Sequence, residues 1–93
     1  MTIQPGEGHG LPPRVRQTII LARTQGYHVQ VKRQERYGPY VVIKQSDDEY
    51  TGYSIVLYVD RTGRRVTPTY FTPLGDRRLT LSTVRHMLRM NTL

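Results

Sequence analysis

The sequence predicts an α+β fold in which a helix, a three- to four-stranded antiparallel sheet and a second helix follow one another (αβββ(β)α), with both helices on one face of the sheet. Apolar residues recur with a helical period near both ends of the chain and with a strand period between them. Glycine and proline separate these patterns as they do at turns. With 93 residues the chain has room for one domain, which we place at residues 12–93, after a flexible N-terminal arm of residues 1–11.

The first predicted helix begins at Pro13 and ends at Gly26. Proline is tolerated in the first helical turn, and glycine is common just beyond the end of a helix. Between them Val15, Ile19 and Ala22 are spaced so that they share one helix face. This spacing predicts an amphipathic helix that packs on the sheet.

Four segments have the composition of strands, and they are residues 27–32, 40–44, 53–59 and 64–71. The second of them is almost wholly apolar, which predicts a central position in the sheet. Pro68 cannot donate a hydrogen bond to a neighbouring strand, so we expect the fourth strand to lie at an edge or to carry a bulge. Residues 45–52 are predicted to form an acidic loop, and residues 60–63 a hairpin turn.

The last part of the chain is predicted to be a loop over residues 72–78 and then a helix. Thr80 or Ser82 is the expected N-cap of this helix, because hydroxyl side chains accept hydrogen bonds from the free N–H groups of the first turn. Val84 and Leu88 follow at helical spacing. The whole order is therefore helix, strands, helix.

Positive charge dominates the composition, with 14 Lys and Arg against 7 Asp and Glu and a formal net charge of +7. Such a charge attracts nucleic acid, acidic lipid or an acidic protein. Arg14 and Arg16 lie in the first turn of the first helix, where positive charge opposes the helix dipole. Either the helix tolerates this arrangement or these arginines face an anionic partner.

Several kinds of chemistry are excluded by the residues present. The chain has no cysteine, which rules out a disulfide framework, an iron–sulfur cluster, a zinc knuckle and a thiol nucleophile. His28 and His86 have no carboxylate partner beside them in the sequence, and no P-loop, dinucleotide fingerprint or serine-nucleophile elbow occurs. We therefore predict a binding protein that is not an enzyme, with no catalytic residue, metal site or cofactor.

The expected location is the cytoplasm. No apolar run is long enough to cross a membrane, and the first residues lack the apolar stretch of a secretory signal peptide.

Tyrosine rings between positive charges favour nucleic-acid binding as the leading hypothesis, because rings stack on bases and arginines bind phosphates. Such residues occur around the first two strands, in the hairpin near residue 64 and along the last helix. The partner would be RNA or DNA, held mainly through its phosphate backbone. The candidate binding residues are Arg33, Arg36, Tyr37, Tyr40, Arg61, Arg64, Arg65, Arg77, Arg78, Arg85 and Arg89.

An alternative hypothesis is a small accessory protein, encoded by a phage or a mobile element, that binds and inhibits a host protein. Short, basic chains without catalytic motifs are typical of this class. Tyrosine is favoured at protein interfaces, and the candidate patch consists of Tyr53, Tyr58, Tyr70 and Phe71. The predicted edge strand at Pro68 could also pair with a second copy of the chain and form a homodimer.

Three short segments carry a family resemblance. Residues 16–27 contain a helix that ends in a glycine before a strand, residues 64–68 a basic hairpin that leads to a proline, and residues 83–89 a closing helix of Thr-Val-Arg-His-Met-Leu-Arg. In these segments the chain resembles the HicA family of small mRNA-interfering toxins, which have a double-stranded-RNA-binding-like fold. The resemblance implies that fold, although the middle of this chain is longer by about one strand.

The same resemblance predicts that ribonuclease activity is absent. The family carries a Gly-Ser-His motif at the start of its second strand, and its histidine is catalytic. The matching run here is Gly38-Pro39-Tyr40, so Tyr40 stands where that histidine is expected.

Overall fold

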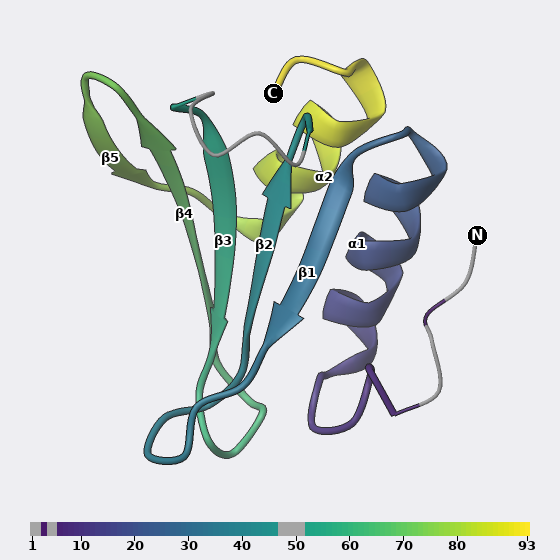
Figure 1. Cartoon of the computed structure of the whole chain (residues 1–93), viewed down its shortest axis with the longest axis vertical. Helices are drawn as coiled ribbons and strands as arrows, with labels where there is room; N and C mark the ends of the chain where they lie inside the picture. The colour runs from purple at the N-terminus through teal and green to yellow at the C-terminus, as the bar shows by residue number, and fades with distance from the viewer. Residues whose placement is uncertain (1–2, 4–5, 47–51) are drawn as a thin grey trace.

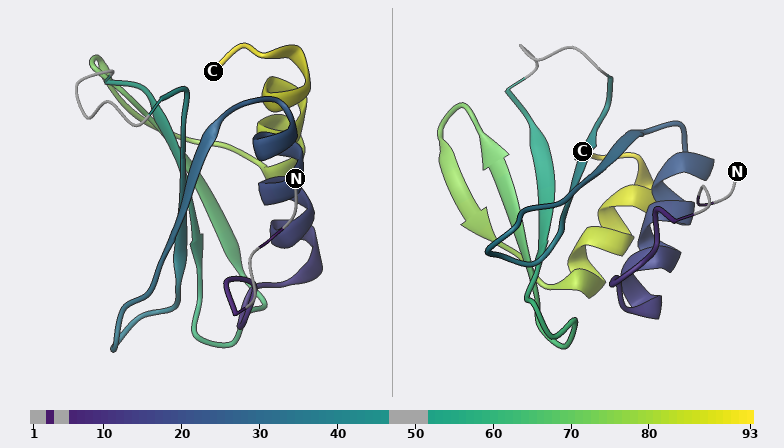
Figure 2. Two further views of the ribbon diagram at one scale, coloured as in Figure 1. Left: turned by 45° about the vertical axis from the view of Figure 1, so that its right-hand side comes forward. Right: turned by 60° about the horizontal axis from the view of Figure 1, so that its bottom comes forward.

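The computed structural model describes residue 3, residues 6–46 and residues 52–93. Its elements are α1 (Pro13–Thr24), β1 (His28–Lys32), β2 (Tyr40–Lys44), β3 (Ser54–Val59), β4 (Val66–Thr72), β5 (Gly75–Arg78) and α2 (Leu81–Met90). The strands form one antiparallel sheet in the order β1-β2-β3-β4-β5, and both helices cover the same face of it (Figures 1 and 2). The α+β class and the helix–sheet–helix order are confirmed, and the sheet has five strands where three or four were expected.

The fifth strand corrects two predictions. Residues 72–78, predicted to be a loop, form the end of β4, a tight turn and β5. Consequently β4 is not an edge strand, because it pairs with β3 on one side and with β5 on the other. The sequence hid β5 because its four residues, GDRR, are all exposed and contain no apolar side chain. Pairing with β4, and not burial, makes this segment a strand.

Pro68 is accommodated inside the sheet by the short reach of β5. Pairing of β4 with β5 runs from Thr72 to Thr69, and Pro68 is the next residue of β4. A residue in a strand directs its nitrogen and its carbonyl to the same side, and the Pro68 carbonyl accepts a hydrogen bond from the Leu79 N–H on the β5 side. The side on which Pro68 lacks an N–H is therefore the β5 side, one residue beyond the last β4–β5 pair, Thr69 with Arg78. No hydrogen bond between β3 and β4 is lost there.

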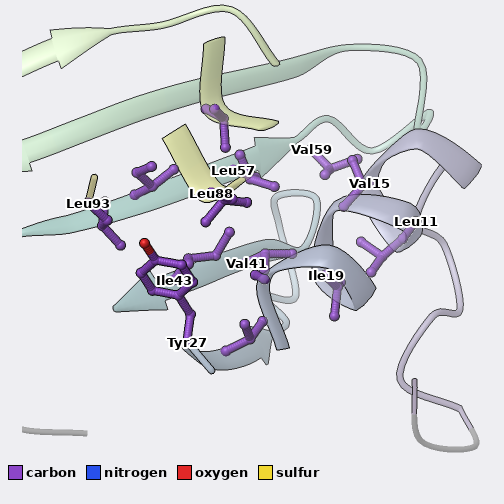
Figure 3. Packing of buried hydrophobic residues seen from close by; sticks show 14 residues of the cluster. Leu11, Val15, Ile19, Tyr27, Val41, Ile43, Leu57, Val59, Leu88 and Leu93 are labelled. Carbon is purple, nitrogen blue, oxygen red and sulfur yellow. The ribbon is translucent and has the colours of Figure 1, made fainter. Parts of the chain in front are cut away.

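The core lies between the sheet and the two helices (Figure 3). Ile19 of α1 and Leu88 of α2 are fully buried against Ile43 of β2 and against Ile55 and Leu57 of β3. The helical spacing predicted for both helices is confirmed, since the buried positions of each helix lie on the face that meets the sheet. Burial of these apolar side chains is the main favourable term in the folding of such a domain.

The helix ends follow local rules. Gly26, with φ of +93°, lies just beyond α1 in a conformation that glycine adopts without strain. Thr80 is the N-cap of α2, because its hydroxyl accepts a hydrogen bond of 3.1 Å from the Thr83 N–H. Of the two expected caps, Thr80 is thus the one in use.

Part of the N-terminal segment contacts the domain. The Arg23 guanidinium donates two hydrogen bonds to the Glu7 carboxylate, at 2.5 and 2.8 Å. Leu11 is buried in the core. The hydrogen bond to Glu7 raises the pKa of Arg23, and this outweighs the lowering by burial. Residues 1–2 and 4–5 of the predicted arm lie outside the described residues, and its flexibility stays a prediction.

Residues 47–51 of the predicted acidic loop are also outside the described residues. Two other connections are residues 33–39, called the β1–β2 loop, and residues 60–65, called the β3–β4 turn. Both lie at the same end of the sheet, at the bottom of Figure 1. Within the described part of the chain, no helix has the length and apolar character needed to cross a bilayer.

Candidate nucleic-acid interface

The face of the sheet opposite the helices carries a row of polar and aromatic side chains. Residues paired in antiparallel strands point to the same face, and the register places Lys32, Tyr40, Tyr58 and Thr67 side by side on four strands. The rings of Tyr40 and Tyr58 are 6.0 Å apart between centroids with their planes tilted by 33°. We call this helix-free side of the sheet the open face.

A pocket of about 520 Å³ lies next to this row, where the β1–β2 loop meets the β3–β4 turn. Tyr37 of the loop, Tyr58 of β3, and Arg61 and Arg65 of the turn contribute to its lining. Tyr37 has 68% and Tyr58 41% of its surface exposed, so both rings are accessible to a ligand. The pocket therefore combines aromatic surface with two guanidinium groups.

The β3–β4 turn is held by Asp60, which also lines the pocket. One oxygen of its carboxylate accepts hydrogen bonds from the Thr62 hydroxyl at 2.9 Å, the Arg64 N–H at 3.0 Å and the Arg65 N–H at 3.2 Å. Gly63, with φ of +74°, completes the turn. The backbone that carries Arg61 and Arg65 is thus organised before any ligand binds.

These hydrogen bonds change the acidity of the carboxyl group. Desolvation raises the pKa of Asp60, but hydrogen bonds from the Arg65 N–H, the Thr62 hydroxyl, the Arg64 N–H and the Gly63 N–H lower it by more. The pKa of Asp60 therefore lies below its ordinary value, and the turn is held by a charged carboxylate at neutral pH.

The β1–β2 loop approaches β3 closely at Gly38. A Cβ atom added at Gly38 would lie 1.8 Å from the carbonyl oxygen of Val59, so no other residue fits there without a backbone shift. The next residue, Pro39, accepts a hydrogen bond of 3.0 Å from the Val59 N–H. Tyr40 then begins β2, in agreement with the strand predicted from the composition of residues 40–44. Gly38 therefore brings Tyr37 against the β3–β4 turn.

The other predicted basic residues are spread over the molecule. Arg33 donates hydrogen bonds to the backbone carbonyls of Gly6 and Glu7 and so holds the N-terminal segment. Arg36 is exposed in the β1–β2 loop and Arg64 in the β3–β4 turn, near the pocket but outside its lining.

Strand β5 and helix α2 carry the remaining arginines. Arg78 pairs with Thr69 on the open face, whereas Arg77 pairs with Tyr70 on the helix side. Arg85 and Arg89 lie on α2, in the layer on the far side of the sheet from the open face. The structure thus brings together Tyr37, Arg61 and Arg65 and adds Tyr40 through its ring contact with Tyr58. The other predicted arginines lie outside the pocket lining.

The four aromatic residues of the alternative protein-binding patch lie on both sides of the sheet. Tyr58 and Phe71 belong to the open face by their register. Tyr70 pairs with the buried Ile55 on the helix side, and its ring lies 6.4 Å from that of Tyr53. The four residues therefore do not form one patch, because Tyr58 and Phe71 lie on the open face and Tyr70, with the ring of Tyr53 near it, lies on the helix side.

Tyr58 lines the pocket, although the sequence predicted it as part of the protein-binding patch and not as a nucleic-acid-binding residue. The alternation in β3 puts Ile55, Leu57 and Val59 in the core and therefore turns Tyr58 to the opposite face. That signal was present in the sequence. Its pairing with Tyr40 was not, because the register of two strands depends on tertiary structure.

A metal centre finds no support among the described residues, since no group of three His, Asp or Glu side chains there could hold an ion. The His28 Nε2 atom is buried without a hydrogen-bond partner in the described part of the chain.

Comparisons with protein-family models, with curated proteins and with solved structures find no match to this chain. The resemblance to the HicA family and to the double-stranded-RNA-binding-like fold accordingly stays a prediction from short motifs.

Proposed function

We propose that this protein binds single-stranded nucleic acid, without catalysis, through the pocket and the adjoining part of the open face. The observation that supports the proposal is the assembly of Tyr37, Tyr58, Arg61 and Arg65 around one pocket. These residues come from the β1–β2 loop, from β3 and from the β3–β4 turn. Tyr37, Arg61 and Arg65 are among the binding residues predicted from the sequence.

Single strands fit this surface better than duplexes do. The faces of bases in a duplex are covered by their stacked neighbours, whereas an unpaired base offers its face to a tyrosine ring. Stacking on an exposed ring contributes about 1–3 kcal/mol per base. Tyr37 and Tyr58 offer such rings, and a pocket of about 520 Å³ lies between them and the arginines.

The arginines supply the second half of the interaction. Arg61 and Arg65 are exposed, and no ion pair to either is found in the described part of the chain. A guanidinium forms a two-pronged hydrogen-bonded pair with a phosphate. The net charge of +7 adds long-range attraction for a polyanion.

The experiment is a fluorescence-anisotropy titration of the full chain with labelled single-stranded RNA, single-stranded DNA and duplexes of equal length, repeated over a salt series. We expect single strands to bind more tightly than duplexes. The logarithm of the association constant should fall linearly with the logarithm of the salt concentration, because phosphate contacts release counterions.

The double variant Arg61→Ala/Arg65→Ala tests the site itself. If each arginine contacts one phosphate, the salt slope should decrease by about 1.4, since each contact with a single strand contributes about 0.7. The affinity should fall by a similar factor for all base sequences. The variant Arg16→Ala/Arg77→Ala removes the same charge from exposed sites outside the pocket, and it should leave most of the affinity intact.

Weak binding, equal for all nucleic acids and abolished near physiological salt, would contradict the proposal. Equal losses in the two double variants would also contradict it, because the charge would then act without a site. Either outcome would favour the accessory protein that binds a host protein.

A further inference from the structure

A second basic site lies in the helix layer, in a groove of about 230 Å³ that is lined by the first turn of α1 and by residues along α2. Its lining consists of Arg14 of α1 and of Leu81, Ser82, Arg85 and Arg89 of α2. Three of these five residues are arginines, and none is acidic. We call it the helix groove.

Two of the three groove arginines, Arg14 and Arg85, are restrained by the rest of the fold, whereas Arg89 is exposed. Arg14 donates a hydrogen bond of 2.8 Å to the backbone carbonyl of Arg64 in the β3–β4 turn. Arg85 is partly buried, and its Nε atom is buried without a hydrogen-bond partner among the described residues. A buried guanidinium N–H without an acceptor is unfavourable, so an acceptor that enters the groove would be bound with a gain in free energy.

The two helices add to the positive potential. Arg14 and Ser82, both in first turns, line the same groove, while Gln25 at the end of α1 donates to the carbonyls of Leu88 and Arg89 near the end of α2. The helices therefore run in the same direction and begin at the same end, as the view from below in Figure 2 shows. Neither helix has an acidic residue in its first turn. The positive ends of both helix dipoles are thus directed to the groove.

This arrangement of charges is unfavourable without an anion. Three guanidinium groups repel one another, and Arg14 lies in the first turn of α1, where the helix dipole favours a negative side chain. Within the described part of the chain the ion pair found is that of Arg23 with Glu7, which is not in the groove. A sequence that keeps locally unfavourable charges together usually does so at a binding site.

We infer that the helix groove binds one phosphate group. A volume of about 230 Å³ is below the roughly 300–1,000 Å³ of sites for drug-sized ligands, and it suits a single tetrahedral anion. Arginine forks match phosphate geometry, and the N–H groups of the first helical turn have no partner within the helix. The inference does not depend on the proposed function, because the groove and the pocket share no residue.

The test is a titration of the full chain with inorganic phosphate, followed by the backbone amide NMR signals of Leu81 and Ser82 and the side-chain Nε–H signal of Arg85. Sodium chloride keeps the ionic strength constant. We expect saturable shifts of these three signals. The variant Arg14→Gln/Arg85→Gln should bind phosphate about tenfold more weakly or worse, because each arginine supplies a charge-assisted hydrogen bond.

Two further variants make the result specific. Arg85→Lys keeps the charge but loses the planar fork and Nε, so its affinity should lie between those of the wild type and the double variant. Arg36→Gln/Arg77→Gln removes the same charge outside the groove and should bind phosphate as the wild type does. Unchanged amide dispersion in each variant shows that the fold is retained.

A single-stranded oligonucleotide, titrated in parallel, identifies the source of the phosphate. If Arg14→Gln/Arg85→Gln weakens both ligands, the groove binds the backbone of a nucleic acid; if it weakens inorganic phosphate alone, the groove binds a small phosphate-containing molecule. The inference is wrong if phosphate shifts do not saturate, match those caused by chloride, or persist unchanged in the double variant. Such a failure does not test the proposed function, since Arg61 and Arg65 are intact in every variant. The single variant Arg85→Gln separates the two sites, because it also keeps the hydrogen bond of Arg14 to the β3–β4 turn.

Discussion

Asp60 shows how one side chain organises the pocket. Its carboxylate accepts hydrogen bonds from the Thr62 hydroxyl and from the backbone N–H groups of Arg64 and Arg65, and the backbone between them becomes a tight turn. One of its two oxygens accepts all three of these hydrogen bonds, and the turn that they hold places Arg61 and Arg65 on the pocket wall. The sequence predicted Asp60 to lie in a hairpin turn, and the structure adds that its carboxylate holds the backbone that carries Arg61 and Arg65.

The lowered pKa of Asp60 predicts a loss of stability in acid. The folded pKa is below the unfolded value of about 3.8, so this carboxylate stabilises the fold above that value and the stabilisation is lost as the pH falls through the folded pKa. We expect the free energy of unfolding, measured with urea between about pH 6 and about pH 2, to fall less steeply for Asp60→Asn than for the wild type.

Asp76 supplies the matched control for this experiment. It is an exposed carboxylate on β5, and Asp76→Asn removes the same charge from the chain. The prediction fails if the two variants change the pH profile equally, because general charge and not the turn would then account for the effect.

At the scale of elements, the site depends on one close approach between two connections. The β1–β2 loop touches β3 at Gly38, and the hydrogen bond from the Val59 N–H to the Pro39 carbonyl fixes the distance. The loop and the turn that form the pocket are thereby held at the end of the sheet, next to the Tyr40–Tyr58 pair. The strand that begins at Tyr40 was predictable from the sequence, whereas the contact of Gly38 with Val59 was not.

Gly38→Ala tests this contact. The added methyl group would lie 1.8 Å from the Val59 carbonyl oxygen, so the loop must move away from β3. We expect a destabilisation of about 1–3 kcal/mol in chemical unfolding, as for other overpacked sites, together with weaker nucleic-acid binding. Gly8→Ala is the control, because the atoms nearest to its added Cβ belong to the side chains of Arg16 and Ile3, which can adjust, and not to the backbone. An unaffected Gly38→Ala protein would show that the loop does not need this approach.

At the scale of the whole molecule, the sheet protects both of its edges. Arg23 donates a hydrogen bond of 3.1 Å to the Val29 carbonyl of β1, and β5 is a four-residue strand with exposed Asp76, Arg77 and Arg78. Charged residues on a short edge disfavour pairing with another chain. The homodimer through an edge strand stays a prediction, but the edges at which it would form are β1 and β5 and not the strand that contains Pro68.

The core predicts a sharp contrast between two leucines. Leu57 on β3 is fully buried between the sheet and the helices, whereas Leu74 in the β4–β5 turn is 99% exposed. We expect Leu57→Ala to lower the free energy of unfolding by about 2–5 kcal/mol, and Leu74→Ala to change it by less than about 0.5 kcal/mol. Urea unfolding followed by circular dichroism measures both, and similar effects of the two substitutions would contradict the packing described here.

The sequence by itself determined the elements that have an apolar pattern. The spacing of Val15, Ile19 and Ala22 predicted α1, and the alternation through Ile55, Leu57 and Val59 predicted the buried face of β3. These predictions succeeded because neighbours a few residues apart decide which side of a helix or strand is apolar.

Tertiary structure alone decided β5, the register and the sites. Strand β5 exists because β4 offers it hydrogen bonds, and Tyr40 meets Tyr58 because β2 and β3 pair in one register out of several. The pocket and the helix groove each unite residues that are far apart along the chain. Contacts of this kind depend on how whole elements pack, and the pattern within any one segment does not contain that information.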